Sequence, residues 1–305
     1  MLKSLAKRAA KTLLSDGPNI PLASSISLPW EMKEKLAQIE MATRSLLKIK
    51  MRTSFLPNAR SMMHYQMPDR QRLGPIWQYW NSGASRCPPI IQECMASVQR
   101  YATGREIIVL SDDTLHDFIT LPAHISAKRE QMGATHFSDV LRVCLLAQHG
   151  GTWIDASVLL TGKIDEITSG IPFFVFSRPN DPFMISNWFI HSIAGHSLVC
   201  AMRDLLVEYW LTEDEVRAYF MFHFLFESAV TLHADLREIW KKTPTVFLGP
   251  AVLLQTALYV GSNFERLRDI CCRTPIHKLT WKFPEPALLQ AERIVKWTRN
   301  LGSVS

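Results

Sequence analysis

Two charged side chains interrupt an apolar stretch between residues 136 and 148, HFSDVLRVCLLAQ. Asp139 and Arg142 lie three residues apart, so a helix would present both on the same face. Because buried charges must be paired or bound to something, the pair has two interpretations. It is either an internal salt bridge, the commoner use of such residues, or part of a site whose ligand contacts both charges.

Asp155 is the second chemical feature. Residues 150–151 are a double glycine that ends the helix, and residues 152–154 begin a strand that ends at Asp155. Ligands of open α/β sheets bind beyond the carboxyl ends of the strands. A carboxylate there can hold a divalent cation while a diphosphate fills the other coordination positions. Asp155 could also be a phosphatase nucleophile of the haloacid-dehalogenase type, but Ser157 stands where that class needs a second Asp.

The elements that must position these residues predict an α/β domain. Their expected residue ranges are strands over 76–80, 106–110, 152–155, 173–176 and 187–192, helices over 88–101, 113–119, 136–148, 197–211, 213–233, 250–259 and 286–299, and an extended segment over 276–282. Alternation of strands and helices in the first half predicts a parallel sheet, and the second half is helix-rich.

Residues 1–73 are expected to be an N-terminal helical extension and linker before a domain over 74–305. In the first 13 residues, apolar side chains share one helical face and lysines another. This pattern indicates a helix lying on the cytoplasmic face of a membrane; a helix packed on its own domain is the alternative. No apolar run reaches the ~18–20 residues that cross a bilayer, and no signal peptide is present, so we expect a cytoplasmic or peripheral location.

Composition excludes some function classes. The 305 residues carry 34 basic and 28 acidic side chains, a net charge of +6 without an arginine-rich block. This argues against nucleic acid as a partner and suits a phosphate-bearing ligand or an anionic membrane. The six cysteines show no CxxC pair and no zinc-like spacing, so we expect reduced thiols.

The central segment resembles a known family. SDVLR followed by HGGTWIDASVLLTG is similar to the core of the capsular polysaccharide synthesis family, and more distantly to the family-32 glycosyltransferases and the large clostridial glucosylating toxins. The resemblance covers about residues 74–285, with weaker likeness in PIWQYWNSG, SNWF, YFMFHFLFE and PIHKLTWK. It implies a GT-A-like fold, a nucleotide-sugar donor and retention of anomeric configuration.

The resemblance also implies roles for single residues. Trp80 matches an aromatic residue that stacks on the donor base, and Asp139 and Arg142 match positions that contact the donor sugar and its ribose–phosphate region. Asp155 matches the first Asp of the DxD motif, which binds Mn²⁺ or Mg²⁺. Ser157 departs from the second Asp, which puts the metal site in doubt and implies weaker binding or help from Asp165 or His277.

Further candidates lie outside the central segment. Asn187 and Trp188 could hydrogen-bond to the sugar and wall it off, or be structural. His277 and Lys282 match a histidine and a lysine that reach the metal and diphosphate in GT-A domains, where a lysine would stabilise the leaving group. Alternation places Lys278 and Lys282 on one face and His277 on the other. A solvated basic strand is the alternative.

Two more residues have a structural and a functional interpretation. Trp77 is expected in the core. His223 lies in a buried aromatic helix, where a core histidine is the commoner case, although Glu227 on the same face could pair with it.

Together these features predict a glycosyltransferase that moves a sugar from a nucleotide-sugar donor to a glycan or lipid-linked glycan in capsule, exopolysaccharide or lipopolysaccharide synthesis. The alternative is a non-catalytic, glycosyltransferase-like scaffold at the membrane, because the second Asp of the motif is missing.

Overall fold

The computed structural model describes residues 73–102, 104–178 and 185–301. The expected helical extension over residues 1–73, with its membrane-facing helix, lies outside the described residues apart from Leu73. Within the described ranges, no helix combines the length and apolarity needed to cross a bilayer.

A six-stranded sheet forms the centre of the domain, in the order β2-β1-β3-β6-β5-β7. Its strands are β1 (Ile76–Tyr79), β2 (Ile107–Leu110), β3 (Gly151–Ile154), β5 (Phe173–Ser177), β6 (Phe189–Ser192) and β7 (Thr245–Phe247). All neighbours are parallel except at β6, which is antiparallel to β3 and β5. The sequence predicts a parallel sheet, and the antiparallel direction of β6 corrects that prediction. The segment 178–188 before it is shorter than the dozen or so residues that a parallel crossover needs.

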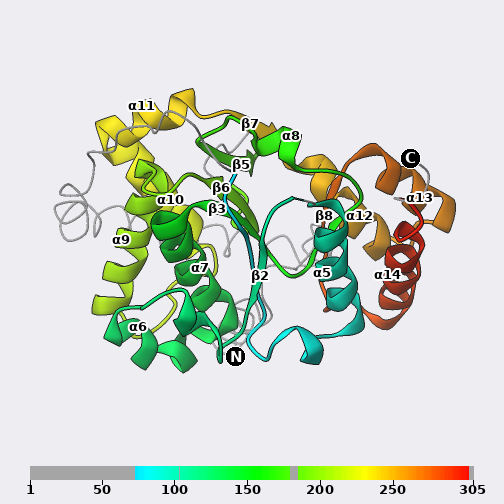
Figure 1. Ribbon diagram of the computed structural model, residues 1–305, viewed down its shortest axis with the longest axis horizontal. Coiled ribbons are helices and arrows are strands. Elements are labelled where there is room, and N and C mark those ends of the chain that lie inside the picture. Colours follow the sequence, from blue (N-terminus) through cyan, green and yellow to red (C-terminus); the bar gives the residue numbers. More distant parts are fainter. Residues whose placement is uncertain (1–72, 103, 179–184, 302–305) are drawn as a thin grey trace, which may run out of the picture.

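Helices cover both faces of the sheet (Figure 1). One side carries α6 (Ala123–Ala127), α7 (Arg129–His149), α9 (Ser197–Thr212), α10 (Met221–Leu232) and α11 (Ala234–Lys242), and the other carries α5 (Pro89–Tyr101), α12 (Gly249–Tyr259), α13 (Phe264–Arg273) and α14 (Glu285–Thr298). Apolar clusters fill the space between each helical layer and the sheet. This arrangement confirms the predicted α/β class with a helix-rich C-terminal half.

A second, two-stranded sheet joins distant parts of the chain. β4 (Val158–Leu160) pairs antiparallel with β8 (Ile276–Lys278), and the register sets Val158 opposite Lys278. The backbone N–H of Leu279 continues the pairing by donating to the Ser157 carbonyl at 2.9 Å. The segment that follows Asp155 is thereby fixed beside the end of β8.

Glycines shape both ends of the apolar helix. Gly133 has φ 63° and ψ 170° inside α7, so a fresh helical segment begins at Ala134. After the helix, Gly150 and Gly151 have φ of 66° and 102°. A Cβ on Gly151 would lie 2.2 Å from the carbonyl oxygen of Pro75, so only glycine allows β3 to approach the start of β1 this closely.

Several local expectations were wrong. Residues 113–119 form only the short 3₁₀ helix η4 (Leu115–Asp117), because the turn at Ser111–Thr114 closes on itself through side-chain contacts. The helix expected over 213–233 begins at Met221. The structure also contains elements that the sequence pattern did not predict: α6, β4, α8 (Asp165–Thr168), α11, β7, α13 and the 3₁₀ helix η3 (Ala84–Arg86).

Candidate functional site

A pocket of about 560 Å³ opens at the carboxyl ends of β1 and β3. Eight of the residues expected to contact the donor or the metal line it: Trp80, Asp139, Arg142, Asp155, Ser157, Asn187, Trp188 and Lys282. They come from segments between residues 80 and 282, so the fold gathers them from most of the domain. This is the place where open α/β sheets bind their ligands.

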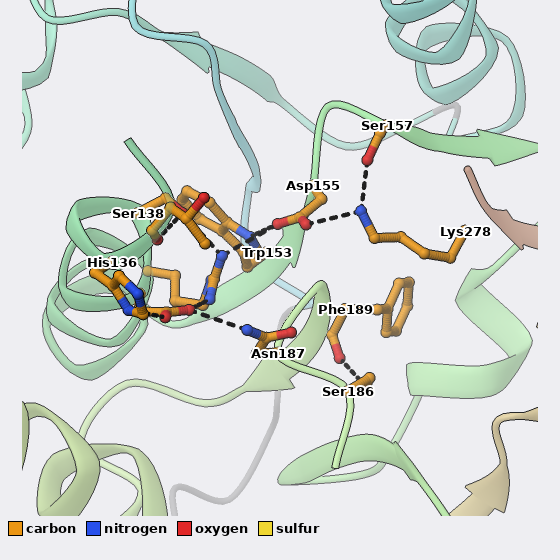
Figure 2. A network of polar contacts seen from close by, with 12 residues as sticks. His136, Ser138, Trp153, Asp155, Ser157, Ser186, Asn187, Phe189 and Lys278 are labelled. Carbon is orange, nitrogen blue, oxygen red and sulfur yellow. Dashed lines mark hydrogen bonds and ion pairs between the residues drawn. The ribbon is translucent and has the colours of Figure 1, made fainter. Parts of the chain in front are cut away.

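Arg142 forms the centre of a buried polar network, and Figure 2 labels its partners Ser138 and Asp155. Its Nη1 donates to Asp139 Oδ1, and its Nη2 donates to Asp155 Oδ1 and Ser138 Oγ at 3.2 and 3.1 Å. The side chain is only 2% exposed, and its guanidinium lies 5.1 Å from the ring centroid of Trp153. One rigid cation therefore ties the apolar helix to the end of strand β3.

Asp155 lies between two cations. Its Oδ1 also accepts a hydrogen bond from Trp153 Nε1 at 2.8 Å, and its Oδ2 is 3.2 Å from the Nζ of Lys278. Burial opposes ionisation of this carboxyl, but Lys278, Arg142 and the Trp153 bond outweigh burial and lower its pKa. Asp155 is therefore ionised at neutral pH.

Lys278 lines the pocket, whereas its neighbour His277, the residue expected there from the sequence, does not. Its Nζ donates to Ser157 Oγ at 2.5 Å and contacts Asp155, as Figure 2 shows. The pairing of β4 with β8 brings it there, since Val158 lies opposite Lys278 in the register. The alternation noted in PIHKLTWK, with Lys278 and Lys282 on one face, was the signal that could have identified it.

Asp139 is held from three sides. Besides Arg142, it accepts from Asn187 Nδ2 at 3.1 Å, and His136 Nδ1 lies 3.6 Å from its Oδ2. Burial and the nearby Arg142 lower the pKa of His136 to about 4, so this imidazole is neutral at pH 7. The Asp139 carboxylate thus depends on Arg142 for its counter-charge.

Aromatic rings border the charged floor. Trp80 is half-buried and meets Trp281 edge-on, with ring centroids 6.3 Å apart. Trp281 itself is 44% exposed, and these two rings form an aromatic corner of the pocket. Trp188 is stacked on Phe176 at 5.3 Å and so forms a fixed wall. Tyr219 also lines the pocket. Its pKa is raised mainly by burial and, to a smaller extent, by the nearby Asp155 carboxylate. Trp281 and Tyr219 were not singled out in the sequence.

His277 does not belong to the pocket. It is completely buried, and its Nε2 donates at 3.1 Å to Thr161 Oγ1, whose own hydroxyl donates to the Thr274 carbonyl. Strand alternation turns His277 away from the face that Lys278 presents, so the expected histidine ligand is corrected to a structural residue. Asp165, the other expected helper, lies 3.5 Å from Arg105 and does not line the pocket.

Trp77 and His223 are the remaining candidates, and they lie in different surroundings. Trp77 is 2% exposed and donates to the Gly150 carbonyl, which confirms the predicted core role. His223 lines the pocket, and its Nε2 donates to the backbone oxygen of Ile185 at 3.0 Å. Glu227 is buried on the same helix.

The residues at the DxD position do not fit a divalent cation. The described residues contain no group of three or more His, Cys, Asp or Glu side chains placed to share a metal. Of the expected set, His277 faces elsewhere, Ser157 is neutral, and Asp155 is already contacted by two cations. One carboxylate can hold Mg²⁺ or Mn²⁺ when phosphates supply the other oxygen ligands, but here the carboxylate of Asp155 is already shared by Arg142 and Lys278.

The charge of the pocket favours an anion. Among the described residues, two carboxylates line it, those of Asp139 and Asp155, against four basic side chains from Arg142, Arg178, Lys278 and Lys282. In addition, Ala134 and Thr135, in the helical turn that begins after Gly133, border the cavity, and the N-terminal end of a helix carries partial positive charge. A ligand bearing phosphate groups would meet a surplus of donors.

Comparison with known proteins places the chain. A profile of the capsular polysaccharide synthesis protein family matches residues 31–296. Among curated proteins, no sequence matches. Among solved structures, the chain is similar to the PaToxG glycosyltransferase with 12% identity and a TM-score of 0.40, over 84% of this chain and 96% of that one.

Proposed function

The chain belongs to the capsular polysaccharide synthesis family, and from this premise we propose that it is a glycosyltransferase. It would move a sugar from a nucleotide-sugar donor to a glycan or lipid-linked glycan acceptor during synthesis of a surface polysaccharide. Membership of the family and a pocket with a cationic surplus support this proposal.

The observation that carries the proposal is Arg142, which bridges Asp139 and Asp155 on the pocket floor. A nucleotide sugar combines a flat base, a doubly charged diphosphate and a hydroxyl-rich ring. The aromatic corner of Trp80 and Trp281 suits the base, the cations suit the diphosphate, and Asp139 with Asn187 suits the sugar hydroxyls.

In the proposed reaction, the bond between the anomeric carbon and the diphosphate oxygen breaks, and the electron pair stays on that oxygen. The acceptor hydroxyl forms the new bond to the same carbon, and its proton passes to the departing diphosphate. The residues of the site hold and orient the reactants and stabilise the developing negative charge. We also propose that the reaction retains the anomeric configuration. None of the described pocket residues is assigned as a nucleophile in this reaction.

Calorimetric titration of the full chain with a panel of nucleoside diphosphates and nucleotide sugars tests this function. We expect one base to bind and Asp139→Asn to weaken the matching nucleotide sugar more than the nucleoside diphosphate. Asp165→Asn is the matched control, because it makes the same change in an Arg–Asp pair outside the pocket. NMR of the reaction product then reports the anomeric configuration.

Absence of binding and of transfer would contradict the proposed function. If no member of the panel binds and no donor is hydrolysed or transferred, the chain is the non-catalytic scaffold that the missing second Asp allows. The proposal for a transferase would then be withdrawn.

A further inference from the structure

The ammonium of Lys278 occupies the gap between the two side chains of the DxD position. Its Nζ lies 3.2 Å from Asp155 Oδ2 and 2.5 Å from Ser157 Oγ, and the side chain is 14% exposed (Figure 2). In a DxD site with two carboxylates, this gap between them is where the cation would sit.

The position of Lys278 is built into the backbone. β4 and β8 pair directly, Val158 faces Lys278 in the register, and the Leu279 N–H donates to the Ser157 carbonyl at 2.9 Å. Asp155 is fixed independently by Arg142 and Trp153. The contact of Lys278 with Asp155 and Ser157 therefore joins elements that are held together by main-chain bonds, unlike a surface lysine that meets a carboxylate by chance.

We propose that Lys278 replaces the divalent cation, so that this transferase binds and releases the diphosphate of its donor without a metal. The inference rests on the proposed function and specifies how the same site handles the leaving group.

Charge explains why a metal and Lys278 exclude each other. A divalent cation bound to Asp155 would lie beside both Lys278 and Arg142, which already share that carboxylate. Ser157 supplies no negative charge to offset the repulsion. An ammonium has three N–H donors, of which Asp155 and Ser157 accept two, and the third is left for a phosphate oxygen.

Lys278 can stabilise the departing diphosphate without a metal. As the bond from the anomeric carbon to the diphosphate breaks, negative charge develops on the departing oxygen. Lys278 stabilises that charge by a charge-assisted hydrogen bond without transferring a proton, while the acceptor proton goes to the diphosphate. Ser157 and Asp155 act as positioning residues that aim the ammonium.

The first experiment compares nucleoside diphosphate binding by the full chain in EDTA and in Mn²⁺. We titrate UDP, GDP, CDP, ADP and dTDP by calorimetry and expect the same affinity in both buffers for the base that binds. In parallel, electron paramagnetic resonance of free Mn²⁺ measures metal binding without nucleotide, and we expect no difference between the natural chain and Asp155→Asn.

The second experiment interchanges the two kinds of cation. Lys278→Ala should weaken nucleoside diphosphate binding and lower transfer by about 10²-fold, the usual effect of losing one leaving-group donor, and Lys278→Arg should restore part of both. The double variant Lys278→Ala, Ser157→Asp rebuilds a pair of carboxylates and should bind the diphosphate only when Mn²⁺ is present. Lys241→Ala, on an exposed helix outside the pocket, is the control.

The outcomes separate the two proposals. Binding that requires Mn²⁺ in the natural chain overturns the role of Lys278 and leaves the transferase intact. Binding in EDTA that Lys278→Ala does not weaken also overturns it. No binding in either buffer overturns the proposed function and, with it, this inference.

Discussion

Arg142 donates to Asp139 one helical turn away, and both side chains are almost fully buried, with exposures of 2% and 3%. The sequence left two interpretations of this pair, an internal salt bridge or a ligand site. The structure shows that the salt bridge exists and that both residues also line the pocket. One buried pair thus serves as floor of the site and as brace between helix α7 and strand β3.

Removing the cation from this pair should cost much stability. Arg142→Met leaves Asp139 buried without its counter-charge, and breaking a buried pair from one side costs about 3–5 kcal/mol. Urea unfolding followed by circular dichroism measures the free energy of unfolding. Arg273→Met is the control, because Arg273 is 70% exposed and its pair with Asp269 should contribute less than about 1 kcal/mol. Equal losses in the two variants would show that the network adds nothing.

Buried histidines should make the fold sensitive to mild acid. Burial lowers the pKa of His277 to about 4, as it does for His136, His191 and His196. Between pH 6.5 and 4 the unfolded chain binds protons that the folded chain does not, so stability falls as the pH falls. Each histidine contributes up to ~1.4 kcal/mol per pH unit to that slope.

The variant His277→Gln isolates one of these protons. We expect the slope of unfolding free energy against pH, measured near pH 5, to decrease by about one histidine's share. His116→Gln is the control, since His116 is 70% exposed. An unchanged slope in His277→Gln would mean that His277 titrates normally in the folded chain.

The aromatic corner should act on the base and not on the phosphates. Trp281 is 44% exposed and contacts the Trp80 ring and the Lys282 ammonium, so Trp281→Ala should fold normally and lose chiefly a stacking surface. Stacking on an aromatic side chain contributes about 1–3 kcal/mol per base in nucleic-acid complexes, which predicts roughly 5–150-fold weaker binding of the nucleoside diphosphate. Trp281→Phe should recover most of it. Calorimetry with pyrophosphate, which lacks a base, should give the same affinity for all three proteins; a matching loss there would refute the stacking role.

Gly133 should be required for its backbone angles alone. An added Cβ there meets nothing within 4 Å, yet φ is 63° and ψ is 170°. Gly133→Ala therefore tests conformational strain without a clash, and we expect a loss of about 1–3 kcal/mol in thermal or urea unfolding. Gly170→Ala is the comparison, at a glycine outside the pocket with φ 73° and nothing within 4 Å of an added Cβ, and it should also lose stability. If Gly133→Ala is as stable as the natural chain, the break in α7 is not needed to set the helical turn beside the pocket.

Local pattern in the sequence was enough for the central unit. The apolar helix with Asp139 and Arg142, the double glycine and the strand that ends at Asp155 follow from periodicities within some 20 residues, and the structure has all of them. Local patterns likewise predicted that α5 begins at the proline pair 88–89 and that Trp77 lies in the core. It failed at Leu115–Asp117, where side-chain contacts of the preceding turn outweighed a weak helical pattern.

Which side chains meet across the pocket was decided by tertiary structure. His277 and Lys278 are adjacent, and only the pairing of β8 with β4 makes the lysine face Asp155 and the histidine face Thr161. The sequence by itself determined the α/β class and the charged floor of the site, because those depend on short-range spacing. The cation beside Asp155 depends on strand register over 121 residues, and only the packed fold fixes that register.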